Sequence, residues 1–515
     1  MQGMIVSGTR RLTRAELIDR AARAASGFSA LGVAENDAIA LMLRNDFAFF
    51  EAAFAAAHLG AYAVPVNWHF TTEEAGYILR DCAARALVVH ADLLPQVRSA
   101  IPDGVSVMVV PTPSEIVDAY GIDGSQLVIP ASMPKGWQNW GEWLGGQMPW
   151  TAPPKPSRTN MIYTSGTTGQ PKGVRRQPAT AEMQQAMGRM VQAAFDLGPD
   201  RTIRTVITGP IYHSAPNFYA LVAATHAELV VLQPRFDAEQ LLQMIEQYQI
   251  THLHMVPTMF VRLLKLPAEV RGKYDLTSLL CVAHGAAPCP IDVKRRMIEW
   301  WGPVIREYYG GTETGVVVTH TSEEALRKPG TVGRAIEGAI LRVYDPDGQQ
   351  LAPGEIGEIF LRVGEFPDFT YHGLDERRRE VERDGLISCG DVGYLDADGY
   401  LFLCDRARDM VISGGTNIYP AEIEGVLVAM PGVQDCAVFG IPDDEFGEAL
   451  CAYIQPEEGA ELTADGVGAF VRRHLARYKV PKVIEFVDTL PGEDSGKIFK
   501  RKLRAPYWEK AGRQI

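Results

Sequence analysis

The sequence predicts an α/β fold with a large N-terminal domain and a small, mobile α+β lid domain at the C-terminal end. The N-terminal domain is expected to contain parallel-rich sheets covered by helices, followed by a β subdomain. Strand-like and helix-like segments alternate through most of the chain, which is typical of parallel sheets with helices on their faces. Short strands with Asp-Gly and Pro-Gly turns then occupy residues 331–362, as in a small β subdomain. A charged segment at 405–409 precedes a second, smaller alternation of strands and helices.

Hydrophobic periodicity and helix-end signals predict the individual elements. Apolar residues at helical spacing predict a helix over 13–31, with Thr13 as its cap, and a strand over 38–42. A second helix over 47–59 is expected to end at Gly60. Residues 112–157 are rich in proline, glycine and tryptophan, and we expect a long surface excursion there. The remaining predicted strands and helices lie at 62–66, 86–89, 105–110, 204–207, 229–232, 241–248 and 252–256.

The charged run Asp405-Arg406-Ala407-Arg408-Asp409 is the predicted domain boundary. An Asp-Gly hairpin over 394–404 precedes it. A helix over 421–430 follows it, with a proline at its start and Pro-Gly at its end. We therefore predict an N-terminal domain at 1–405, a hinge at 406–409 and a lid domain at 410–515.

Composition excludes several classes of protein. The net charge of −13 over 515 residues argues against a nucleic acid or an anionic membrane surface as the main partner. The seven cysteines are scattered, odd in number and free of any Cys-x-x-Cys motif, which is typical of a reducing compartment. The first residues show no apolar signal core, and the longest apolar region is too interrupted to span a bilayer. We expect a cytoplasmic protein.

The most informative stretch, residues 163–174, reads Tyr-Thr-Ser-Gly-Thr-Thr-Gly-Gln-Pro-Lys-Gly-Val. Its glycines can turn successive N–H groups toward one centre. Its hydroxyls and Lys172 add donors and a positive charge, which suits a polyphosphate. Pro171 before the lysine and a glycine after it exclude a Walker A loop. The alternative is a surface turn rich in glycine and threonine. The candidate phosphate ligands are Thr164, Ser165, Gly166, Thr167, Thr168, Gly169 and Lys172.

Four further segments carry candidate chemistry. Residues 308–315 place Glu313 beside a hydroxyl in a glycine-rich turn, which suits Mg²⁺ next to phosphate; a solvated turn glutamate is the alternative. Asp391 can accept hydrogen bonds from two ribose hydroxyls, unless it is a simple turn residue. The small residues at 285–288 would let the backbone approach a flat base. Lys497 follows a turn that presents it, although a basic, solvated tail is the usual meaning of such a run.

Six motifs in this order resemble those of the adenylate-forming superfamily, which includes acyl-CoA synthetases, stand-alone adenylation domains and beetle luciferases. The motifs are Thr-Ser-Gly-Thr-Thr-Gly-x-Pro-Lys-Gly, Tyr-Gly-Gly-Thr-Glu, Gly-Asp-x-Gly-Tyr, Asp-Arg-x-Arg-Asp, Gly-Gly-x-Asn-Ile-Tyr-Pro-x-Glu-Ile-Glu and Gly-Lys. The resemblance runs from about Thr13 to Arg504. It implies an AMP-forming carboxylate–CoA ligase that uses ATP, Mg²⁺ and coenzyme A.

The resemblance also implies a role for each matching residue. The loop at 164–173 would hold the ATP phosphates, with Glu313 and Thr164 at Mg²⁺ and Thr312 at the α-phosphate. Lys497 would contact the substrate carboxylate and a phosphate oxygen, and Arg408 would be the hinge residue. The other nucleotide-binding residues would be Gly285, Ala286, Ala287, Tyr309, Gly310, Asp391 and Arg406. The residues of the CoA channel would be Gly414, Gly415, Thr416 and Asn417.

The physical reasoning agrees with a two-step reaction. Attack of a carboxylate on the α-phosphorus of ATP gives an acyl-adenylate and pyrophosphate, and a thiol then takes the acyl group. The first step needs positioning and neutralisation of negative charge. The second step needs a different set of groups at the same intermediate, which a rotating lid would supply.

The segment 209–217 resembles the family motif that closes over the acyl group, and it places His213 beside the acyl carboxylate or the thiol; a packed, aromatic-like histidine is the alternative. It contains no acid, which disfavours α-amino acids as substrates. The apolar stretch 254–264 resembles synthetases for fatty or bulky alicyclic acids. Its Met255, Met259 and Phe260 would line the acyl pocket or belong to the core.

The expected partners are therefore a small hydrophobic carboxylic acid, ATP and CoA. Two alternatives remain: an acyl-AMP ligase that loads a carrier-protein phosphopantetheine, and a non-catalytic nucleotide-binding relative. The turn before Lys497 reads Gly-Glu-Asp-Ser, where relatives often carry Arg-Thr and small residues, so two acids lie close to this lysine. A lysine acetyltransferase acting on Lys497 would remove the charge that adenylation needs. The sequence leaves open a monomer or a homodimer.

Overall fold

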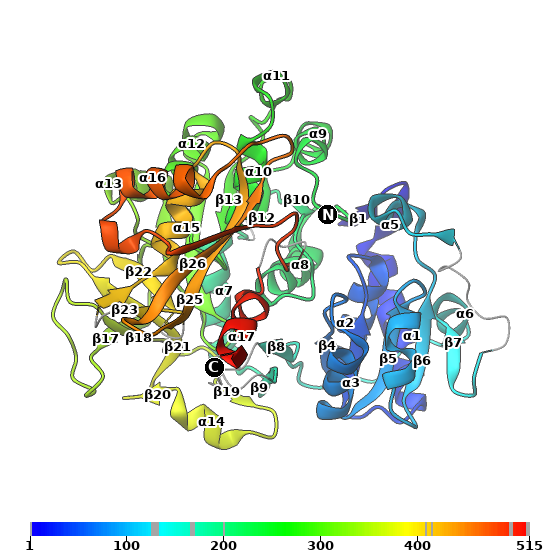
Figure 1. Ribbon diagram of the computed structural model, residues 1–515. Coiled ribbons are helices and arrows are strands. Elements are labelled where there is room, and N and C mark those ends of the chain that lie inside the picture. The colour runs from blue at the N-terminus through cyan, green and yellow to red at the C-terminus, as the bar shows by residue number, and fades with distance from the viewer. Residues whose placement is uncertain are drawn as a thin grey trace.

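A computed structural model of the chain describes residues 3–124, 133–164, 170–198, 201–406, 409–413, 416–493 and 498–510. Figure 1 shows a first lobe in blue, a central region in green and yellow, and the C-terminal part in orange and red beside that central region. These lobes match the predicted α/β class, with parallel sheets and helices in the N-terminal part.

The first lobe is built on a parallel sheet with the strand order β4-β3-β5-β6-β7. Helix α1 (Arg14–Ala30) begins after Thr13, which forms the predicted capping box with Glu16. Helix α2 (Phe47–Leu59) ends at Gly60, whose φ of 64° is the left-handed conformation that glycine adopts without strain. The strands are β3 (Ala38–Met42), β4 (Tyr62–Pro65), β5 (Ala84–His90), β6 (Ser106–Val110) and β7 (Trp137–Asn139), and two further helices are α3 (Thr72–Asp81) and α4 (Leu94–Val97).

The prediction of a long surface excursion at 112–157 is wrong in part, because this segment contains regular elements. Helix α5 (Ser114–Tyr120) follows β6, β7 extends the sheet, and helix α6 (Trp140–Gly145) comes next. Trp140 and Trp143 are buried against Phe28 of α1. The indole N–H of Trp140 donates to the buried carboxylate of Glu51 at 2.7 Å. The tryptophans therefore supply core area, which composition alone did not reveal.

The central sheet has the strand order β16-β15-β14-β13-β12-β10-β11-β1-β2, and the pairs from β14 to β1 are parallel. Its strands are β1 (Met4–Ser7), β2 (Arg10–Thr13), β10 (Arg204–Ile207), β11 (Leu229–Leu232), β12 (His252–Met255), β13 (Cys281–His284), β14 (Ile305–Gly311), β15 (Gly315–Thr321) and β16 (Arg334–Ala335). Its helices are α7 (Ala181–Phe195), α8 (Ser214–His226), α9 (Ala238–Tyr248), α10 (Pro257–Leu264), α11 (Ala268–Arg271), α12 (Ile291–Trp301) and α13 (Ser322–Arg327). A hydrophobic cluster with members from α1, α2, α7, α8 and the strands of both sheets joins the first lobe to this region.

Two smaller sheets complete the N-terminal part. The predicted β subdomain is an antiparallel sheet of β17 (Ala339–Tyr344), β18 (Gly357–Val363), β20 (Glu382–Arg383), β21 (Leu386–Leu395) and β22 (Leu401–Arg406). The predicted hairpin at 394–404 is the β21–β22 pair. The other sheet contains β8 (Ile162–Thr164), β9 (Lys172–Arg176) and β19 (Phe369–Tyr371), with helix α14 (Asp375–Glu380) after it.

The C-terminal part forms a separate sheet with the order β24-β23-β26-β25, to which β27 adds beside β26. Asp405, the last residue before the predicted hinge, accepts a hydrogen bond at 2.9 Å from the backbone N–H of Ala421 in the first turn of α15. The basic run after Lys497, for which a solvated tail was the alternative, continues into α17, whose Trp508 is buried and donates to the carbonyl of Gly440. The elements are β23 (Val411–Ser413), β24 (Thr416–Ile418), α15 (Pro420–Val428), β25 (Val433–Asp443), β26 (Gly447–Pro456), α16 (Ala464–His474), β27 (Val483–Phe486) and α17 (Lys500–Lys510).

Within the described ranges, no helix is long and apolar enough to cross a membrane.

Candidate functional site

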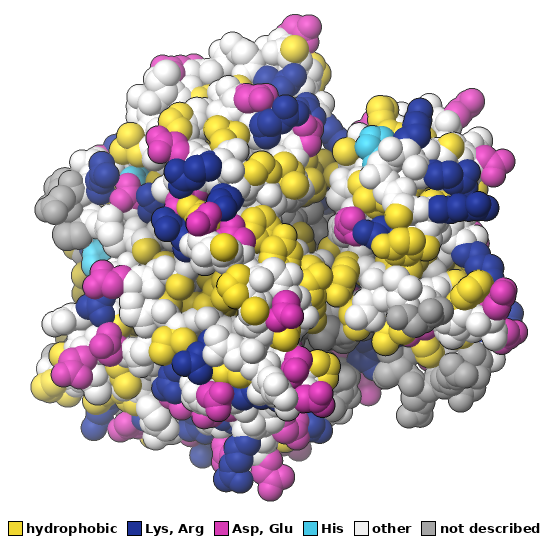
Figure 2. All heavy atoms as spheres, turned by 90° about the vertical axis from the view of Figure 1, so that its left-hand side faces the viewer, with side chains coloured by type: hydrophobic (Ala, Val, Ile, Leu, Met, Phe, Trp, Pro, Cys, Tyr) yellow, Lys and Arg dark blue, Asp and Glu magenta, His cyan; other side chains and the backbone are white. Residues whose placement is uncertain are grey.

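A cavity of about 3160 Å³ lies where the central sheet, the first lobe and the C-terminal part meet. The segments that follow the parallel strands β12, β13 and β14 line it, because the carboxyl ends of parallel strands share one edge of a sheet. Figure 2 shows a hollow between two lobes with hydrophobic side chains gathered along it. The cavity is therefore where ligands of this fold class are expected.

Lys172, at the start of β9, lies near the predicted magnesium ligand Glu313. Thr164 ends β8 and pairs with Lys172 at the start of β9. The ammonium of Lys172 lies 5.1 Å from the ring centre of Tyr371, and the hydroxyl of that tyrosine donates to Oε1 of Glu313 at 3.0 Å. Burial lowers the pKa of Lys172, and the charge of Arg377 lowers it further, while Glu380 and Glu313 oppose this shift. Tyr371, which sequence reasoning missed, thus separates a cation and an anion that suit phosphate and Mg²⁺.

Arg176 holds the turn that carries Thr312 and Glu313. Its Nη2 donates to the carbonyl oxygens of Thr312 at 2.7 Å and of Glu313 at 2.6 Å, and its Nε donates to the carbonyl of Pro367 at 3.2 Å. Burial lowers the pKa of the guanidinium to about 10. No motif pointed to Arg176, because its partners are backbone atoms far away in the chain.

Two positions at the ends of β13 and β14 have room only for glycine. A Cβ at position 310 would lie 1.9 Å from the carbonyl oxygen of Gly315, so no side chain fits at Gly310. A Cβ at Gly285 would lie 2.7 Å from the carbonyl oxygen of Tyr308. Ala286 has a φ of 66° and, with Ala287, is exposed at the cavity. The backbone at the ends of β13 and β14 is therefore closely apposed, and a flat group can approach it.

Asp391 and Tyr309 form a polar pair at the predicted ribose site. The hydroxyl of Tyr309 donates to Oδ2 of Asp391 at 2.7 Å, and Nε of Arg406 lies 3.5 Å from Oδ1. Asp391 and Arg406 face each other in the β21–β22 ladder, so the fold fixes the second contact. Burial, followed by the charge of Asp391, raises the pKa of Tyr309, which keeps its hydroxyl a donor. These three predicted residues lie together in the cavity lining.

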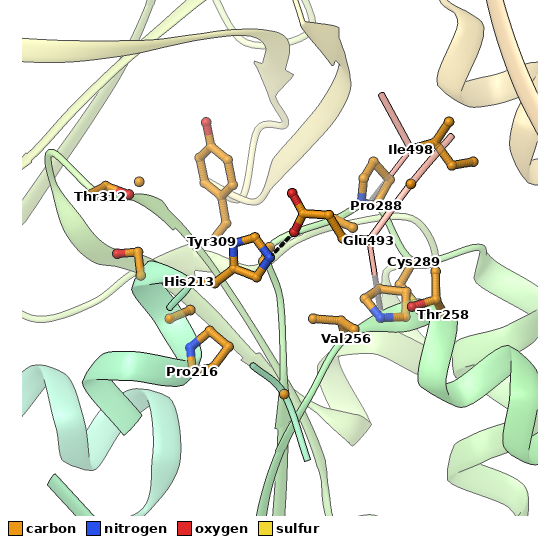
Figure 3. Close-up of a pocket in the computed structure, with 18 of the residues that line it drawn as sticks. His213, Pro216, Val256, Thr258, Pro288, Cys289, Tyr309, Thr312, Glu493 and Ile498 are labelled. Atoms are coloured by element: carbon orange, nitrogen blue, oxygen red, sulfur yellow. Dashed lines mark ion pairs between the residues drawn. The ribbon is translucent and has the colours of Figure 1, made fainter. Parts of the chain in front are cut away.

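His213 lies before the first turn of α8 without capping that helix through its side chain. Its imidazole makes an ion pair with Glu493 from the C-terminal part, as Figure 3 shows. Thr312 and Tyr309 lie on one side of His213 in this view, and Val256, Thr258 and Cys289 lie on the other. The predicted acyl-carboxylate residue is therefore at the junction of the nucleotide and lid surfaces. Glu493 is a site residue that the sequence prediction did not assign.

An aromatic group forms the deeper wall of the cavity beyond His213. The ring of Phe195 lies 5.3 Å from that of Tyr308 and 5.9 Å from that of His254. Nε2 of His254 and the hydroxyl of Tyr308 share a hydrogen bond of 2.7 Å. Burial lowers the pKa of His254 to about 3, so this wall is uncharged at neutral pH. Further lining residues are Met187, Met190, Phe218, Leu221, Val222, Val316 and Phe366.

The predicted lining residues on 254–264 belong mainly to the core. Met255 and Phe260 have no exposed surface, and Met259 is 2% exposed. All three belong to the hydrophobic cluster between α10, α12 and the central sheet. Met255 and Met259 border the cavity. The apolar helix stripe therefore belongs to the core, and the aromatic wall of the cavity comes from α7, β12 and β14.

Several predicted site residues lie outside the described residues. These are Ser165, Gly166, Thr167, Thr168, Gly169, Arg408, Gly414, Gly415 and Lys497. Thr416 and Asn417 are exposed on β24, and neither is part of the cavity lining. Their assignment to the CoA channel concerns another lid position and stays a prediction.

The comparisons with known proteins agree with this geometry. A family model described as AMP-binding enzyme matches residues 3–365, and one described as AMP-binding enzyme C-terminal domain matches residues 422–497. A feruloyl-CoA synthase from Amycolatopsis is 34% identical over 97% of this chain and 95% of the relative. An indoleacetate–CoA ligase from Aromatoleum aromaticum is 32% identical over 96% of this chain and 93% of the relative. The ATP-bound structure of MatB from Rhodopseudomonas palustris matches with a TM-score of 0.80 and 27% identity, covering 98% of this chain and 96% of that one.

Proposed function

The chain belongs to the AMP-binding enzyme family, and from that premise and the site we propose that it joins a hydrophobic carboxylic acid to coenzyme A. The class of reaction is that of an AMP-forming carboxylate–CoA ligase, with ATP, Mg²⁺ and CoA as co-reactants. The acid would first become an acyl-adenylate with release of pyrophosphate. The acyl group would then pass to the thiol of CoA with release of AMP.

The observation that carries this proposal is the position of four predicted residues, Thr312, Glu313, Asp391 and His213, in the lining of one cavity, with Lys172 nearby. Lys172 and Glu313 lie on either side of Tyr371, Thr312 adjoins Glu313, and Asp391 and His213 line the same space. These are the groups that positioning and charge neutralisation at a phosphate require. Glu313 and Thr164 would hold Mg²⁺, which supplies further neutralisation of phosphate charge. The single carboxylate and neighbouring hydroxyl fit that ion, because it keeps several waters and phosphate oxygens as ligands.

The aromatic wall favours an acid with a bulky apolar body, such as an alicyclic, aryl or fatty acid. Phe195, Tyr308 and the neutral His254 offer ring surface and no charge to pair with a substrate ion. The carboxylate of Glu493 accepts hydrogen bonds from Asn67 and Tyr212 and pairs with His213, so it does not serve an α-ammonium group here. The names of the two relatives, a feruloyl-CoA synthase and an indoleacetate–CoA ligase, also point to ring-containing acids.

A panel of acids tests the proposal directly. Purified protein is incubated with MgATP and aryl, alicyclic, fatty, dicarboxylic and α-amino acids, and pyrophosphate exchange is measured for each. AMP release is then compared without acceptor, with CoA and with a phosphopantetheinylated carrier protein. We expect exchange with hydrophobic monocarboxylic acids and AMP release that depends on CoA. Preference for α-amino acids would contradict the substrate class, and transfer only to the carrier protein would contradict the acceptor. Absence of exchange with every acid would overturn the ligase proposal.

A further inference from the structure

Glu493 is a buried carboxylate that joins the C-terminal part to the floor of the site. Its side chain is 3% exposed. Oε1 accepts from Nδ2 of Asn67 at 3.1 Å, and Oε2 accepts from the hydroxyl of Tyr212 at 3.0 Å. Oε2 also forms the ion pair with Nε2 of His213. The donors belong to two separate segments of the N-terminal part, whereas Glu493 lies four residues before Lys497.

The donors form a cradle that other contacts hold in place. The rings of Tyr212 and Trp68 meet edge to face with their centres 4.4 Å apart. The side-chain oxygen of Asn67 accepts from the backbone N–H of His69 at 2.9 Å, which leaves its amide group directed at Glu493. The backbone N–H of Asn217 in α8 donates to the carbonyl oxygen of His213 at 2.9 Å. The side-chain amide of Asn217 donates to the carbonyl oxygen of Ile211 at 2.8 Å, and together the two bonds fix the chain around His213. The cradle thus belongs to the N-terminal part, and the carboxylate is the group that arrives with the lid.

Such a contact stabilises one lid position only. A carboxylate is expensive to bury unless hydrogen bonds and a cation compensate it. Asn67 and Tyr212 donate hydrogen bonds to the carboxylate of Glu493, and Nε2 of His213 faces its Oε2, when the lid is placed as in Figure 3. In the same view Glu493 lies between His213 and Pro288, so it occupies space beside the group that faces the acyl carboxylate. A lid that turns away must withdraw the carboxylate and leave this space open.

We propose that Glu493 is a positioning residue that latches the lid for adenylation and orients His213, and that its withdrawal accompanies the thiol-transfer step. This inference rests on the proposed function, because it assigns the observed contact to the first of the two half-reactions. Glu493 touches neither the nucleotide nor the acid in this assignment; it acts through His213 and through the lid.

Half-reaction measurements test the latch. Glu493→Ala should slow pyrophosphate exchange about tenfold or more, since the lid position used for adenylation loses the hydrogen bonds of a buried carboxylate. Transfer of a supplied acyl-adenylate to CoA should stay within about twofold of the wild-type rate or rise. Glu493→Gln should lie between wild type and Glu493→Ala, because it keeps an acceptor for Asn67. The exposed lid residue Glu461 supplies the matched control Glu461→Gln, which should change neither step. Equal loss of both steps, or unchanged exchange, would overturn the proposal.

A double-mutant cycle with Tyr212→Phe separates a latch from a general loss of stability. The two substitutions should be non-additive in pyrophosphate exchange and additive in acyl transfer. Additivity in both steps would contradict a contact specific to one lid position.

Hydrogen exchange in the ligand-free protein gives a readout that needs no substrate. Peptides covering 208–214 and 485–493 should exchange faster in Glu493→Ala than in wild type, and Glu461→Gln should match wild type. Unchanged protection would overturn the latch even if the enzyme activates acids. Faster exchange would support the latch even if no acid in the panel is activated. The experiment therefore distinguishes failure of the latch from failure of the proposed function.

Discussion

Replacing Arg176 should damage catalysis more than it damages the fold. Its guanidinium binds the carbonyl oxygens of Thr312, Glu313 and Pro367 at 2.6–3.2 Å. The aromatic rings of Phe366 and Phe369 lie 5.1 and 6.0 Å from its carbon Cζ. Arg176→Lys keeps the positive charge but loses the fork that reaches two segments at once, because lysine presents one compact ammonium group. The turn bearing the predicted magnesium and α-phosphate residues then loses its anchor.

The expected magnitude follows from the contacts. Hydrogen bonds to charged groups contribute about 1.5–3 kcal/mol each, and a lysine ammonium retains at most part of the three. A net loss of about 2–3 kcal/mol is therefore reasonable for Arg176→Lys. If this loss appears in the transition state for adenylation, the rate falls roughly 30- to 150-fold, since 1.36 kcal/mol corresponds to a factor of ten.

Pyrophosphate exchange as a function of MgATP and free Mg²⁺ measures this effect. We expect a lower rate of exchange and a higher magnesium requirement in Arg176→Lys. Arg189→Lys is the matched control, because Arg189 makes an exposed ion pair with Glu365 on the neighbouring surface. Circular dichroism and thermal unfolding show whether the fold survives. If exchange kinetics and magnesium dependence match wild type while only the unfolding temperature falls, Arg176 merely supports the fold and our reasoning is refuted.

Three further predictions test other parts of the molecule. Asp391→Ala should raise the KM for ATP about tenfold in pyrophosphate exchange, since the proposed ribose contacts are lost; an unchanged KM would contradict that role. Burial would raise the pKa of Asp46, but the hydrogen bond and charge of His90, with Arg10, lower it to about 2 from 3.8. Because the folded-state value is the lower one, about 2 kcal/mol of stability is present above pH 4 and lost as the pH falls toward 2. Denaturant unfolding should show this acid loss in wild type, and Asp46→Asn should flatten it. Lys497→Ala should abolish adenylation yet pass a supplied acyl-adenylate to CoA, whereas Arg408→Pro should do the reverse; equal loss of both half-reactions in both variants would exclude a two-position lid.

Local structure was predictable where a single segment carries its own signal. Helix α2 has the predicted bounds because its apolar run ends at Gly60, which takes the left-handed conformation that closes the helix. The parallel strands β10 and β11 also have their predicted bounds. Strand β11 is a continuous apolar run, which is typical of a buried parallel strand, whereas β10 is apolar only in its second half. The tryptophans at 140 and 143 were misplaced because composition resembles that of a loop, whereas their burial depends on contacts with α1.

The candidate site residues also fall into those that the sequence could suggest and those that it could not. Residues within motifs, such as Lys172, Glu313 and Asp391, could be proposed from the sequence because each motif carries its chemistry in consecutive positions. Tyr371 and Arg176 were missed because their roles exist only after distant strands meet. Tyr371 joins β19 to the turn of Glu313, 58 residues earlier in the chain. The hydrogen-bond donors to buried Glu493 are Tyr212 and Asn67, which lie 281 and 426 residues away in the chain. No local sequence pattern indicates contacts over such separations.

The two faces of the cavity differ in how firmly the fold holds them. Close backbone packing at Gly310 and the buried guanidinium of Arg176 fix the face that belongs to the central sheet. The C-terminal part contacts the N-terminal part through polar groups such as Glu493 and Lys265, whose ammonium meets Glu457 at 2.8 Å and the carbonyl of Val433 at 2.9 Å. Polar contacts of this kind are typical of domain interfaces that open and close. Because each contributes only a few kcal/mol, a single substitution in the proposed lid would shift the balance between its two positions by tenfold or more. In that proposal the rigid face would keep the nucleotide in place while the lid exchanges one set of groups for another.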